Sequence, residues 1–392
     1  MTWLQAKLKY VAHFAYGDAL PKDQEREGDF KVFGSNGAYD NYGRANTQAP
    51  VIIVGRKGSY GKVNWSDHPC FASDTTFFID ATTTHHHLRW LFYLLQTLNL
   101  DQGTDEAAVP GLSRDDAYAK KVFIPPLGEQ KAIAHYLDIE TAKIDQLIKA
   151  KKRLLALLDE KRRALITHAV TRGLNPDVPM RDSGVEWIGE IPKHWEILPL
   201  RRILQTMDYG ISESVGSEGN IAVLRMGDVD EGEISYDNVG FVDDVDHDLI
   251  LKANDLLFNR TNSLDKIGKV AIFRNNFLFP VSFASYLVRM RCNDSVIPEY
   301  LNYLLNSLPV LTWAKSNALP AIGQVNLNPN RYSYIKIPIP PIEEQLNITE
   351  YIQTNTKKIK KLCLSSEETI KLLQERRTSL ITAAVTGQIK IT

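Results

Sequence analysis

Residues 125–171 read PPLGEQKAIAHYLDIETAKIDQLIKAKKRLLALLDEKRRALITHAVT, and residues 340–386 read PPIEEQLNITEYIQTNTKKIKKLCLSSEETIKLLQERRTSLITAAVT. Aligned without a gap, the two segments are identical at 20 of 47 positions, where chance would give about three. The chain therefore contains an internal repeat, with one copy of the segment in each half. A duplicated chain suits a partner that is itself repeated or has approximate two-fold symmetry.

Each copy of the repeat is predicted to form one long helix. Its two opening prolines suit the first turn of a helix, and Glu129 and Glu344 follow where the helix dipole favours negative charge. A helix of about 45 residues is roughly 65 Å long, too long to be hidden inside one small domain. Apolar residues recur in steps of four and three, the pattern of a coiled-coil seam. We expect this seam to contain Ile133, Leu137, Ile144, Leu147, Leu154, Leu158 and Leu165 in the first copy and Ile348, Ile352, Ile359, Leu362, Leu373 and Leu380 in the second.

The two matched seams can bury each other, so mutual pairing of the helices is favoured. The alternative is that each helix covers only its own half of the protein. Some predicted seam positions are polar in both copies, which weakens a seam but can fix its register. These positions are Glu140 and Asn355, Lys151 and Ser366, and Lys161 and Arg376.

The composition indicates an ordinary soluble protein with room for two or three domains. The chain has 392 residues, 44% of them hydrophobic and 24% charged. A net charge of −1 argues against an autonomous, tight nucleic-acid binder, although it does not exclude local basic patches. No apolar stretch is long enough to span a bilayer and the N-terminus has no signal core, so we expect a cytoplasmic protein without membrane contact.

Outside the repeat the sequence has mixed α/β character. Short β-branched or aromatic runs are separated by Gly, Asn and Asp turns, and the two halves share elements such as Gly61-Lys62-Val63 and Gly268-Lys269-Val270. Residues 173–196 are rich in Pro and Gly without a helical period, which predicts a linker. We therefore expect domains at 1–124 and 197–338, long helices at 125–172 and 339–392, and a linker at 173–196.

The chain lacks recognisable catalytic or metal-binding patterns. It has no Asn-Pro-Pro-aromatic tetrapeptide for a flipped adenine, and residues 58–63 lack the loop that holds nucleotide phosphates. His85, His86 and His87 are adjacent, so they cannot all face one ion in regular structure. We predict no catalytic residues, no metal site and no cofactor bound by this chain.

Three features together resemble a known family. They are the linker SGVEWIGEIPKHW at 183–195, the two Pro-Pro-x-x-Glu-Gln helix starts, and the helix ends LITHAV and LITAAV. The chain resembles the DNA specificity subunit of type I restriction-modification systems over nearly its whole length. The first half departs from the pattern because it opens at Trp3 without the lead-in that precedes the second half.

The resemblance implies a pseudo-two-fold protein with two globular target-recognition domains, joined by two long helices that pair as an antiparallel coiled coil. Each domain would read one half of a split site in double-stranded DNA. Modification subunits would supply the methyltransferase and restriction subunits the ATP-driven nuclease, so S-adenosylmethionine, ATP and Mg would be bound by those partners. The alternatives are a single-chain restriction-methylation enzyme fragment and a coiled-coil adaptor without a nucleic-acid role.

Given this resemblance, polar loops that follow apolar strands are the candidate DNA contacts. Arg, Lys and Asn read base edges, while Lys, Ser and backbone N–H groups contact phosphates. The same residues are also ordinary turn formers. The loops at 55–62 and 259–269 share a frame of Arg and Gly-Lys but differ inside it, as two readers of different half-sites would. The candidates are Asn36, Tyr39, Asn41, Arg44, Arg56, Lys57, Ser59, Tyr60 and Lys62 in the first half, and Asn259, Arg260, Thr261, Asn262, Ser263, Lys266 and Lys269 in the second, with Ser113, Arg114, Gln324 and Asn326 in second rank.

Overall fold

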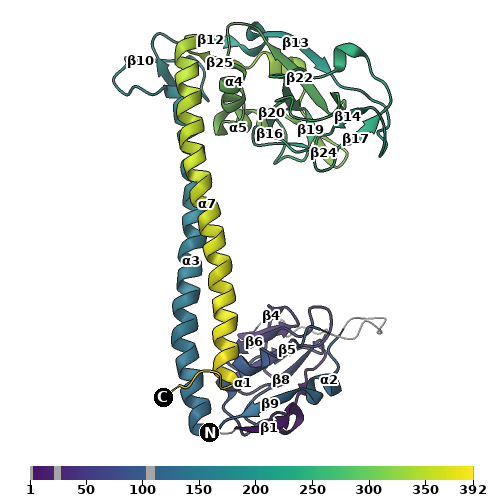
Figure 1. Cartoon of the computed structure of the whole chain (residues 1–392), viewed down its shortest axis with the longest axis vertical. Coiled ribbons are helices and arrows are strands. Elements are labelled where there is room, and N and C mark those ends of the chain that lie inside the picture. The colour runs from purple at the N-terminus through teal and green to yellow at the C-terminus, as the bar shows by residue number, and fades with distance from the viewer. Residues whose placement is uncertain (1–2, 22–27, 103–110, 392) are drawn as a thin grey trace. The chain divides into compact units, whose positions relative to one another are not determined.

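The computed structural model describes residues 3–21, 28–102 and 111–391 of the chain. It divides into two compact units: unit 1 contains residues 1–153 and 366–392, and unit 2 contains residues 154–365. Both long helices pass from one unit into the other. Each unit therefore combines a β-rich globular domain with one part of each helix (Figure 1).

In unit 1 the described residues form three sheets. A four-stranded antiparallel sheet has the order β2 (Ala15–Tyr16), β8 (Thr76–Ile79), β5 (Val51–Gly55) and β6 (Val63–Ser66). A second has the order β4 (Gly37–Tyr42), β3 (Phe30–Gly34) and β7 (Phe71–Ala72), with β3 parallel to β7. The third pairs β1 (Leu4–Lys7) with β9 (Lys121–Ile124). The helices beside them are η1 (Leu8–Tyr10), α1 (Leu88–Leu95) and α2 (Arg114–Ala119).

Unit 2 repeats this topology strand for strand. Its four-stranded sheet has the order β13 (Leu204–Tyr209), β22 (Leu287–Cys292), β18 (Leu256–Asn259) and β20 (Val270–Ile272). Its three-stranded sheet has the order β17 (Gly240–Val242), β14 (Ile221–Leu224) and β21 (Val281–Phe283), again with a parallel pair, β14 and β21. Strand β12 (Glu196–Pro199) pairs with β25 (Lys336–Ile339). The internal repeat recognised in the helices thus extends to the globular domains.

Unit 2 also contains additional elements. These are the hairpin β10 (Met180–Asp182) and β11 (Glu190–Pro192), the hairpin β15 (Val229–Asp230) and β16 (Glu233–Ile234), the sheet β19 (Thr261–Asn262), β24 (Gln324–Asn326) and β23 (Leu319–Ala321), and the helices η3 (His247–Leu249) and α5 (Leu308–Asn317). The helices η2 (Leu200–Ile203), α4 (Pro298–Leu305) and α6 (Pro329–Ser333) correspond to η1, α1 and α2 of unit 1. The β10–β11 hairpin lies within residues 173–196, the segment predicted to be a linker. Ile191 and Trp195 are buried in the core of unit 2, so this segment is part of the folded domain.

The long helices are α3 (Leu127–Arg172) and α7 (Ile342–Val385), of 46 and 44 residues. Helix α3 begins two residues later than predicted, because both prolines precede it and the carbonyl of Pro126 accepts the first helical hydrogen bond from Gln130 at 3.0 Å. Helix α7 ends before residue 392. Gly387, at a φ of +74°, adopts a left-handed conformation that stops the helix, as Gly173 does after α3 with a φ of +77°.

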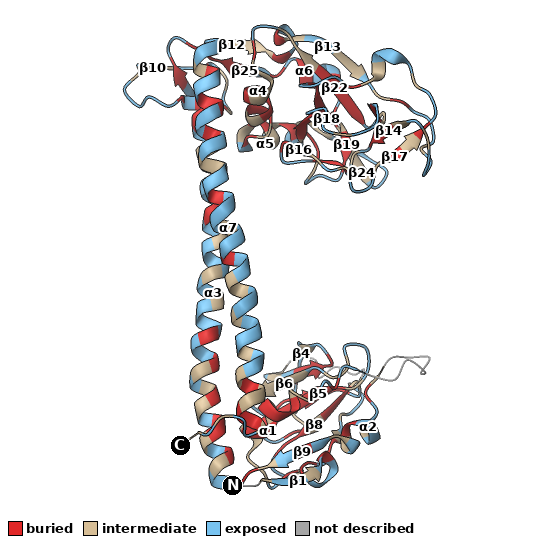
Figure 2. Cartoon of the chain, viewed as in Figure 1, coloured by how far each residue is buried: buried red, intermediate tan, exposed pale blue. Residues whose placement is uncertain are grey.

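The two helices pair in antiparallel fashion. In unit 1, Leu137 near the start of α3 lies in one core with Ile381 near the end of α7. In unit 2, Val170 near the end of α3 shares a core with Ile348 near the start of α7. Mutual pairing is confirmed, and the alternative in which each helix covers only its own half is wrong. Figure 2 shows the buried residues as patches along helices whose outer surfaces are exposed.

The register of the predicted seam is wrong in the middle of both helices. Leu147, Leu154 and Leu362 are exposed, whereas Thr141 is buried and Ile148 is half-buried. The hydroxyl of Thr141 donates back to the carbonyl of Leu137 at 2.6 Å, which satisfies it inside the seam. Counting this polar residue restores a regular alternation of three and four. The seam positions along α3, each buried or half-buried, are then Leu137, Thr141, Ile144, Ile148, Lys151, Leu155, Leu158, Arg162, Leu165 and Ala169, and the residues 215 positions later occupy the same places along α7.

The polar seam assignments change with this register. Lys151 is half-buried and Ser366 is buried at the seam, as predicted. Lys161 and Arg376 are exposed, so the prediction for them is wrong. Glu140 and Asn355 lie one residue before the seam positions held by threonines, and they are half-buried. The Glu140 and Asn355 pair and the Lys161 and Arg376 pair each lie one residue before a seam position. The predicted register follows apolar residues alone and therefore does not include Thr141.

The glutamine of the repeated Pro-Pro-x-x-Glu-Gln motif connects each globular domain to its long helix through hydrogen bonds. Gln130 is 1% exposed; its side-chain oxygen accepts from the backbone N–H of His87, at the start of α1, at 2.9 Å, and its side-chain nitrogen donates to Pro125 at 2.8 Å. Gln345 accepts from the N–H of Ile297, at the start of α4, at 2.7 Å and donates to Pro340 at 2.9 Å. The same motif therefore satisfies the same buried backbone groups in both units.

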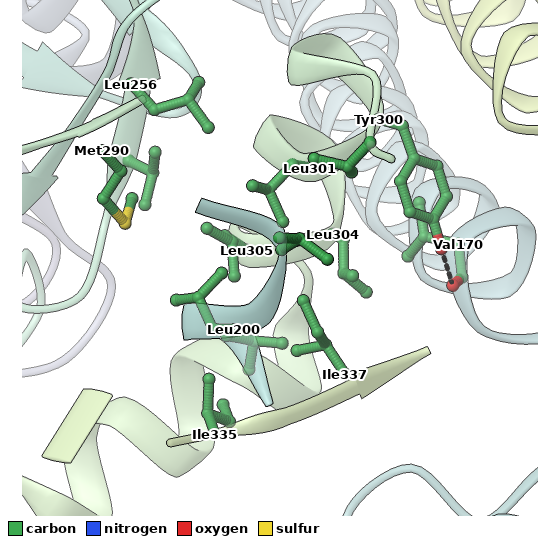
Figure 3. Packing of buried hydrophobic residues seen from close by; sticks show 14 of the residues in the cluster. Val170, Leu200, Leu256, Met290, Tyr300, Leu301, Leu304, Leu305, Ile335 and Ile337 are labelled. Carbon is green, nitrogen blue, oxygen red and sulfur yellow. Dashed lines mark hydrogen bonds between the residues drawn. The ribbon is translucent and has the colours of Figure 1, made fainter. Parts of the chain in front are cut away.

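Each domain core is continuous with its helices. In unit 2, Leu200, Leu256, Met290, Leu301 and Leu304 pack together, and the hydroxyl of Tyr300 donates towards Val170 of α3 at 3.2 Å (Figure 3). Complete burial, together with the nearby Glu344, holds the pKa of Tyr300 well above its usual value, so the phenol stays neutral. Among the described residues, no helix is both long and apolar enough to cross a membrane.

Candidate nucleic-acid interface

Arg56 directly follows β5, and two backbone hydrogen bonds hold its main chain in place. Its N–H donates to the carbonyl of Thr75 at 2.8 Å, and its own carbonyl accepts from Leu112 at 2.8 Å. The guanidinium lies 4.8 Å from the ring centre of Tyr16 and donates to the carbonyl of Asp74 at 3.2 Å. Half-buried and held on an aromatic face, this arginine loses little freedom when it binds a further acceptor.

Arg260 occupies the same setting in unit 2. Its N–H donates to Tyr286 at 3.1 Å and its carbonyl accepts from Leu327 at 2.8 Å. The guanidinium lies 5.2 Å from the ring centre of Tyr209 and donates to the carbonyl of Ser285 at 3.3 Å. The two arginines are therefore structural equivalents on equivalent tyrosines.

A glycine follows each of these tyrosines for a steric reason. A Cβ atom on Gly17 would lie 2.1 Å from the carbonyl oxygen of Ser73, and one on Gly210 would lie 2.1 Å from that of Phe283. Such distances are shorter than any real contact, so only glycine, which has no Cβ atom, fits at these two positions. The close approach holds each tyrosine at the edge where its arginine lies.

The predicted frame of Arg and Gly-Lys is present in both units. Gly55 donates to the carbonyl of Lys62 at 2.8 Å, and Asn259 donates to that of Lys269 at 2.9 Å. The lysine side chains then differ. Lys62 donates to Asn36, which brings the loops at 34–44 and 55–62 together, whereas Lys269 pairs with Asp230.

In unit 1 most of the candidate residues are exposed. The guanidinium of Arg114, of second rank in the sequence, lies 4.9 Å from the ring centre of Tyr16, the tyrosine that Arg56 also contacts. Ser113 caps α2 by accepting from Asp116 at 3.4 Å, and Tyr60 is half-buried against the core. Burial and the nearby carboxylates of Asp40 and Asp74 raise the pKa of Tyr39. The exposed candidates are Asn36, Tyr39, Asn41, Arg44, Lys57, Ser59 and Lys62.

In unit 2 three candidates are buried and hold the loop from inside. Asn259 is 0% exposed, and its side chain donates to the carbonyl of Met226 at 2.9 Å, as that of Asn262 does at 3.0 Å. Thr261 is also buried and accepts from Asn326 at 2.8 Å. The amide nitrogens of both asparagines and the hydroxyl of Thr261 are thus used within the protein, whereas Ser263 is exposed and donates its hydroxyl to Asn262 at 3.4 Å, and Lys266 is half-buried. Gln324 is half-buried beside the sulfur of Met226, 3.8 Å away.

Two parts of the site were missed from the sequence. Tyr16 and Tyr209 precede their arginines by many residues, and no local pattern connects them. Strand β14 has the same place in its sheet as β3, so the segment after residue 224, which includes Met226, corresponds to the loop at 34–44. The apolar runs at 30–34 and 221–224, each followed by a turn, were the available signal.

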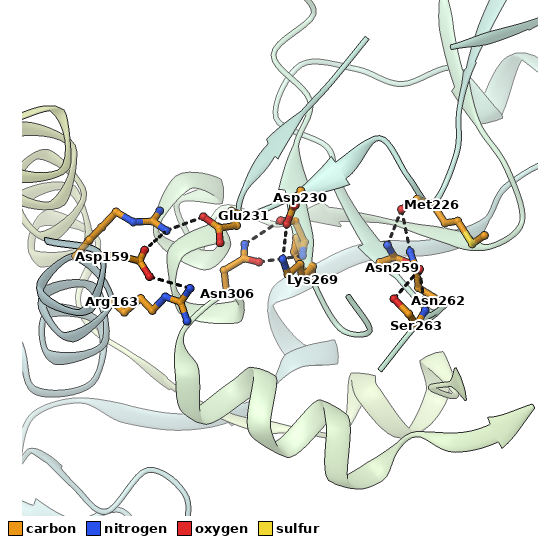
Figure 4. A network of polar contacts seen from close by, with 12 residues as sticks. Asp159, Arg163, Met226, Asp230, Glu231, Asn259, Asn262, Ser263, Lys269 and Asn306 are labelled. Atoms are coloured by element: carbon orange, nitrogen blue, oxygen red, sulfur yellow. Dashed lines mark hydrogen bonds and ion pairs between the residues drawn. The ribbon is translucent and has the colours of Figure 1, made fainter. Parts of the chain in front are cut away.

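The Lys269 side of the site reaches the long helix. Asp230 ends β15 and Glu231 begins the turn to β16; Asp230 binds Lys269, and Glu231 accepts from Arg162 of α3 at 2.6 Å (Figure 4). Arg162 also binds Asp159 at 3.2 Å. Arg162 therefore links α3 to the globular domain of unit 2.

The histidine triplet takes structural roles beside a pocket of about 630 Å³ in unit 1. His87 is the N-cap of α1, and the side-chain nitrogen of Gln130 lies 2.9 Å from Nδ1 of His86. Burial lowers the pKa of both imidazoles. Within the described part of the chain, no group of three or more His, Cys, Asp or Glu side chains is placed to hold a metal ion.

A family model for the type I restriction modification DNA specificity domain matches residues 1–156 and 195–367, well over half of the chain. The chain belongs to this family. Among curated specificity subunits, it is 30% identical over 170 residues to the putative MjaX subunit of Methanocaldococcus jannaschii, covering 42% of this chain and 40% of that relative. It is 24% identical over 318 residues to the EcoBI subunit of Escherichia coli (77% and 66%). With the EcoKI subunit of Escherichia coli K12 it shares 26% over 242 residues (59% and 49%).

The matched regions thus span 40% to 66% of the length of these curated relatives. Solved structures resemble this specificity-family chain along nearly all of its length. A chain from a study of complex assembly and conformational transition of the type I R-M system has a TM-score of 0.75 at 13% identity, covering 99% of this chain and 98% of that chain. The HsdS subunit of Thermoanaerobacter tengcongensis has a TM-score of 0.53 at 15% identity, covering 99% and 97%. These likenesses show a shared fold.

Proposed function

We propose that this chain is the sequence-specific DNA-recognition subunit of a type I restriction-modification complex and that it reads a bipartite target in double-stranded DNA. Residues 1–124 and 197–338 are the two target-recognition domains, one for each half-site. The observation that carries this proposal is the repeated arginine on a tyrosine face, held by the same backbone bonds in both domains. A guanidinium presented in this way suits the O6 and N7 acceptors of guanine in the major groove.

Differences around this shared pair support two different half-sites. Arg56 has a second arginine, Arg114, on the same tyrosine, whereas the position that corresponds to Arg114 in unit 2 is Pro329. The proposed contacts of the first domain are Asn36, Tyr39, Asn41, Arg44, Arg56, Lys57, Ser59, Lys62 and Arg114, and those of the second are Arg260, Ser263, Lys266, Lys269 and Gln324. Asn259, Thr261 and Asn262 are buried, so together with Asn326, which donates to Thr261, they position the second loop instead of reading bases.

The chain acts with partners and is not itself the enzyme. Modification subunits contribute the methyltransferase and restriction subunits the translocase-nuclease, so S-adenosylmethionine, ATP and Mg are bound by them. The net charge of −1 supports this division, because partners that close around the DNA can neutralise phosphates that a near-neutral chain cannot. Exposed leucines at equivalent positions of the two helices, Leu147 with Leu362 and Leu157 with Leu372, offer apolar surface for such subunits.

Selection from a random duplex pool tests the proposal. The full chain, co-purified with its modification subunit, should enrich a split motif and methylate it, while the chain alone should transfer no methyl group from S-adenosylmethionine. Methylation by the chain alone would favour a single-chain enzyme fragment. A complex that enriches no motif would favour a coiled-coil adaptor without a nucleic-acid role.

A further inference from the structure

The hairpin β23–β24 of unit 2 exposes an unusual run of apolar residues. Residues 318–322 read ALPAI; Leu319 is 63% exposed and Ile322, at the tip, is fully exposed. A run of this length on the surface is unfavourable for a soluble domain unless the surface has a binding role. The tip is formed by Ile322 and Gly323, and the φ of +70° at Gly323 makes the tight turn that projects the isoleucine.

The base of this hairpin is fixed to the arginine loop. Strand β24 pairs with β19, which directly follows Arg260, and the N–H of Leu327 at its end donates to the carbonyl of Arg260 at 2.8 Å. Asn326 donates to the hydroxyl of Thr261 at 2.8 Å. Ile322 therefore stands on the same small sheet as the guanidinium, and its position is set by the bonds that set the arginine.

This continuity selects DNA as the occupant of the hairpin tip. A two-stranded ribbon is of the right width to enter the major groove. Among the groups that base edges present there, the C5 methyl of thymine is the apolar one, and an aliphatic side chain is its natural partner. A protein partner would need a broader apolar surface. The exposed apolar residues of this hairpin end at its tip in a single branched side chain, that of Ile322, close to Gln324.

We propose that Ile322 contacts the C5 methyl of a thymine in the half-site read by the second domain, adding an apolar determinant to the polar reading by Arg260. This inference rests on the proposed function, because it requires that the second domain bind DNA. The contact selects thymine over cytosine at one position, since cytosine lacks the methyl group.

Replacement of single thymines by deoxyuridine, which lacks only this methyl group, tests the contact. The complex of the full chain with its modification subunit is bound to its target duplex, with one thymine of the second half-site replaced at a time. We expect binding to weaken about fourfold at one position, the effect of one buried methyl group, and little elsewhere. Ile322→Ala should abolish that sensitivity, while Ile322→Val should retain most of it.

Leu278→Ala is the matched control, because Leu278 is also an almost fully exposed aliphatic residue of the same domain but lies outside the β19–β24–β23 sheet. It should bind as the unchanged protein does. The inference is overturned if Ile322→Ala loses affinity equally for thymine and deoxyuridine duplexes, if it loses none, or if the second half-site contains no thymine. If the unchanged complex shows no sequence preference at all, it is the proposed function that fails.

Discussion

Gln130→Leu should destabilise unit 1 while leaving unit 2 intact. The substitution keeps the size of the side chain but removes the acceptor of the His87 N–H at 2.9 Å and the donor to the Pro125 carbonyl at 2.8 Å. At 1% exposure the site admits no water to replace them. Each buried group left unpaired costs about 1–3 kcal/mol, so the free energy of unfolding of unit 1 should fall by roughly 2–6 kcal/mol.

Hydrogen exchange read by mass spectrometry separates the units. Peptides from α1 and β9 should exchange at least about 30-fold faster in Gln130→Leu, the equivalent of roughly 2 kcal/mol, while peptides from α4 and β25 keep their rates. Gln345→Leu should give the opposite pattern, because the same two bonds occur there at 2.7 and 2.9 Å. A single unfolding midpoint would be less informative, since two units need not unfold together.

Lys131→Leu is the control for adding an apolar side chain to the same helical turn, since Lys131 is exposed. It should leave both sets of rates unchanged. If Gln130→Leu accelerates exchange by less than about threefold, or accelerates it equally in both units, the glutamine does not fasten the domain to the helix and the reasoning is refuted.

Arg56→Ala and Arg260→Ala should each cost about 1–3 kcal/mol of binding energy at one half-site only, measured by competition with duplexes altered in either half; equal loss on all sequences would indicate a phosphate contact, and no loss from either would refute the loop assignment. Seven residues inserted near Ala150 preserve the heptad phase to within about 20° and add roughly 10 Å of helix, so the preferred spacer should lengthen by up to about three base pairs. Methylation of duplexes with graded spacers measures this, and an active variant with an unchanged preference would contradict it. Burial lowers the pKa of His86 below 6.5, so its contribution to stability is present above about pH 6.5 and lost as the pH falls through the lower folded value. Thermal melts at pH 7.5 and 5.5 should show a smaller loss for His86→Asn than for the unchanged protein, and equal losses would count against this role. Without its modification subunit the chain should bind DNA weakly or aggregate, and a well-behaved monomer with tight, specific binding would contradict the dependence on partners.

The long helices were predictable because their signals are local. Repeated prolines, acidic first turns and apolar steps lie within one segment, and the structure places the helices within a few residues of the prediction. The predicted seam register is wrong at Thr141, because a count of apolar residues alone does not include a polar residue that lies in the seam. Its hydroxyl is satisfied by Leu137 of its own helix, and only the three-dimensional arrangement shows that this position faces the partner.

The site was predictable only in part, for a different reason. The Arg and Gly-Lys frame is contained in single loops, so its recurrence could be seen in the sequence. Whether Asn259 and Asn262 face solvent depends on where the chain around Met226 passes, more than thirty residues earlier. Their residue type made both asparagines good candidates for reading bases. In the structure both are buried, and their side-chain amides donate to the carbonyl of Met226.

One equivalent position shows how the two domains came to differ without losing their shared frame. A Cβ on Gly55 would lie 2.9 Å from the carbonyl of Ser35, so the first domain closes this point by direct packing of backbone on backbone. The second has Asn259 there, whose side chain spans a wider gap to Met226 at 2.9 Å. Exchanging the two residues would overpack one domain and remove one of the two side-chain donors to the Met226 carbonyl in the other, leaving only Asn262. The arginine loop and the turn that supports it, at Ser35 in the first domain and at Met226 in the second, therefore act together in recognition. An arginine loop moved from one domain to the other should keep its half-site preference only if its supporting turn is moved with it.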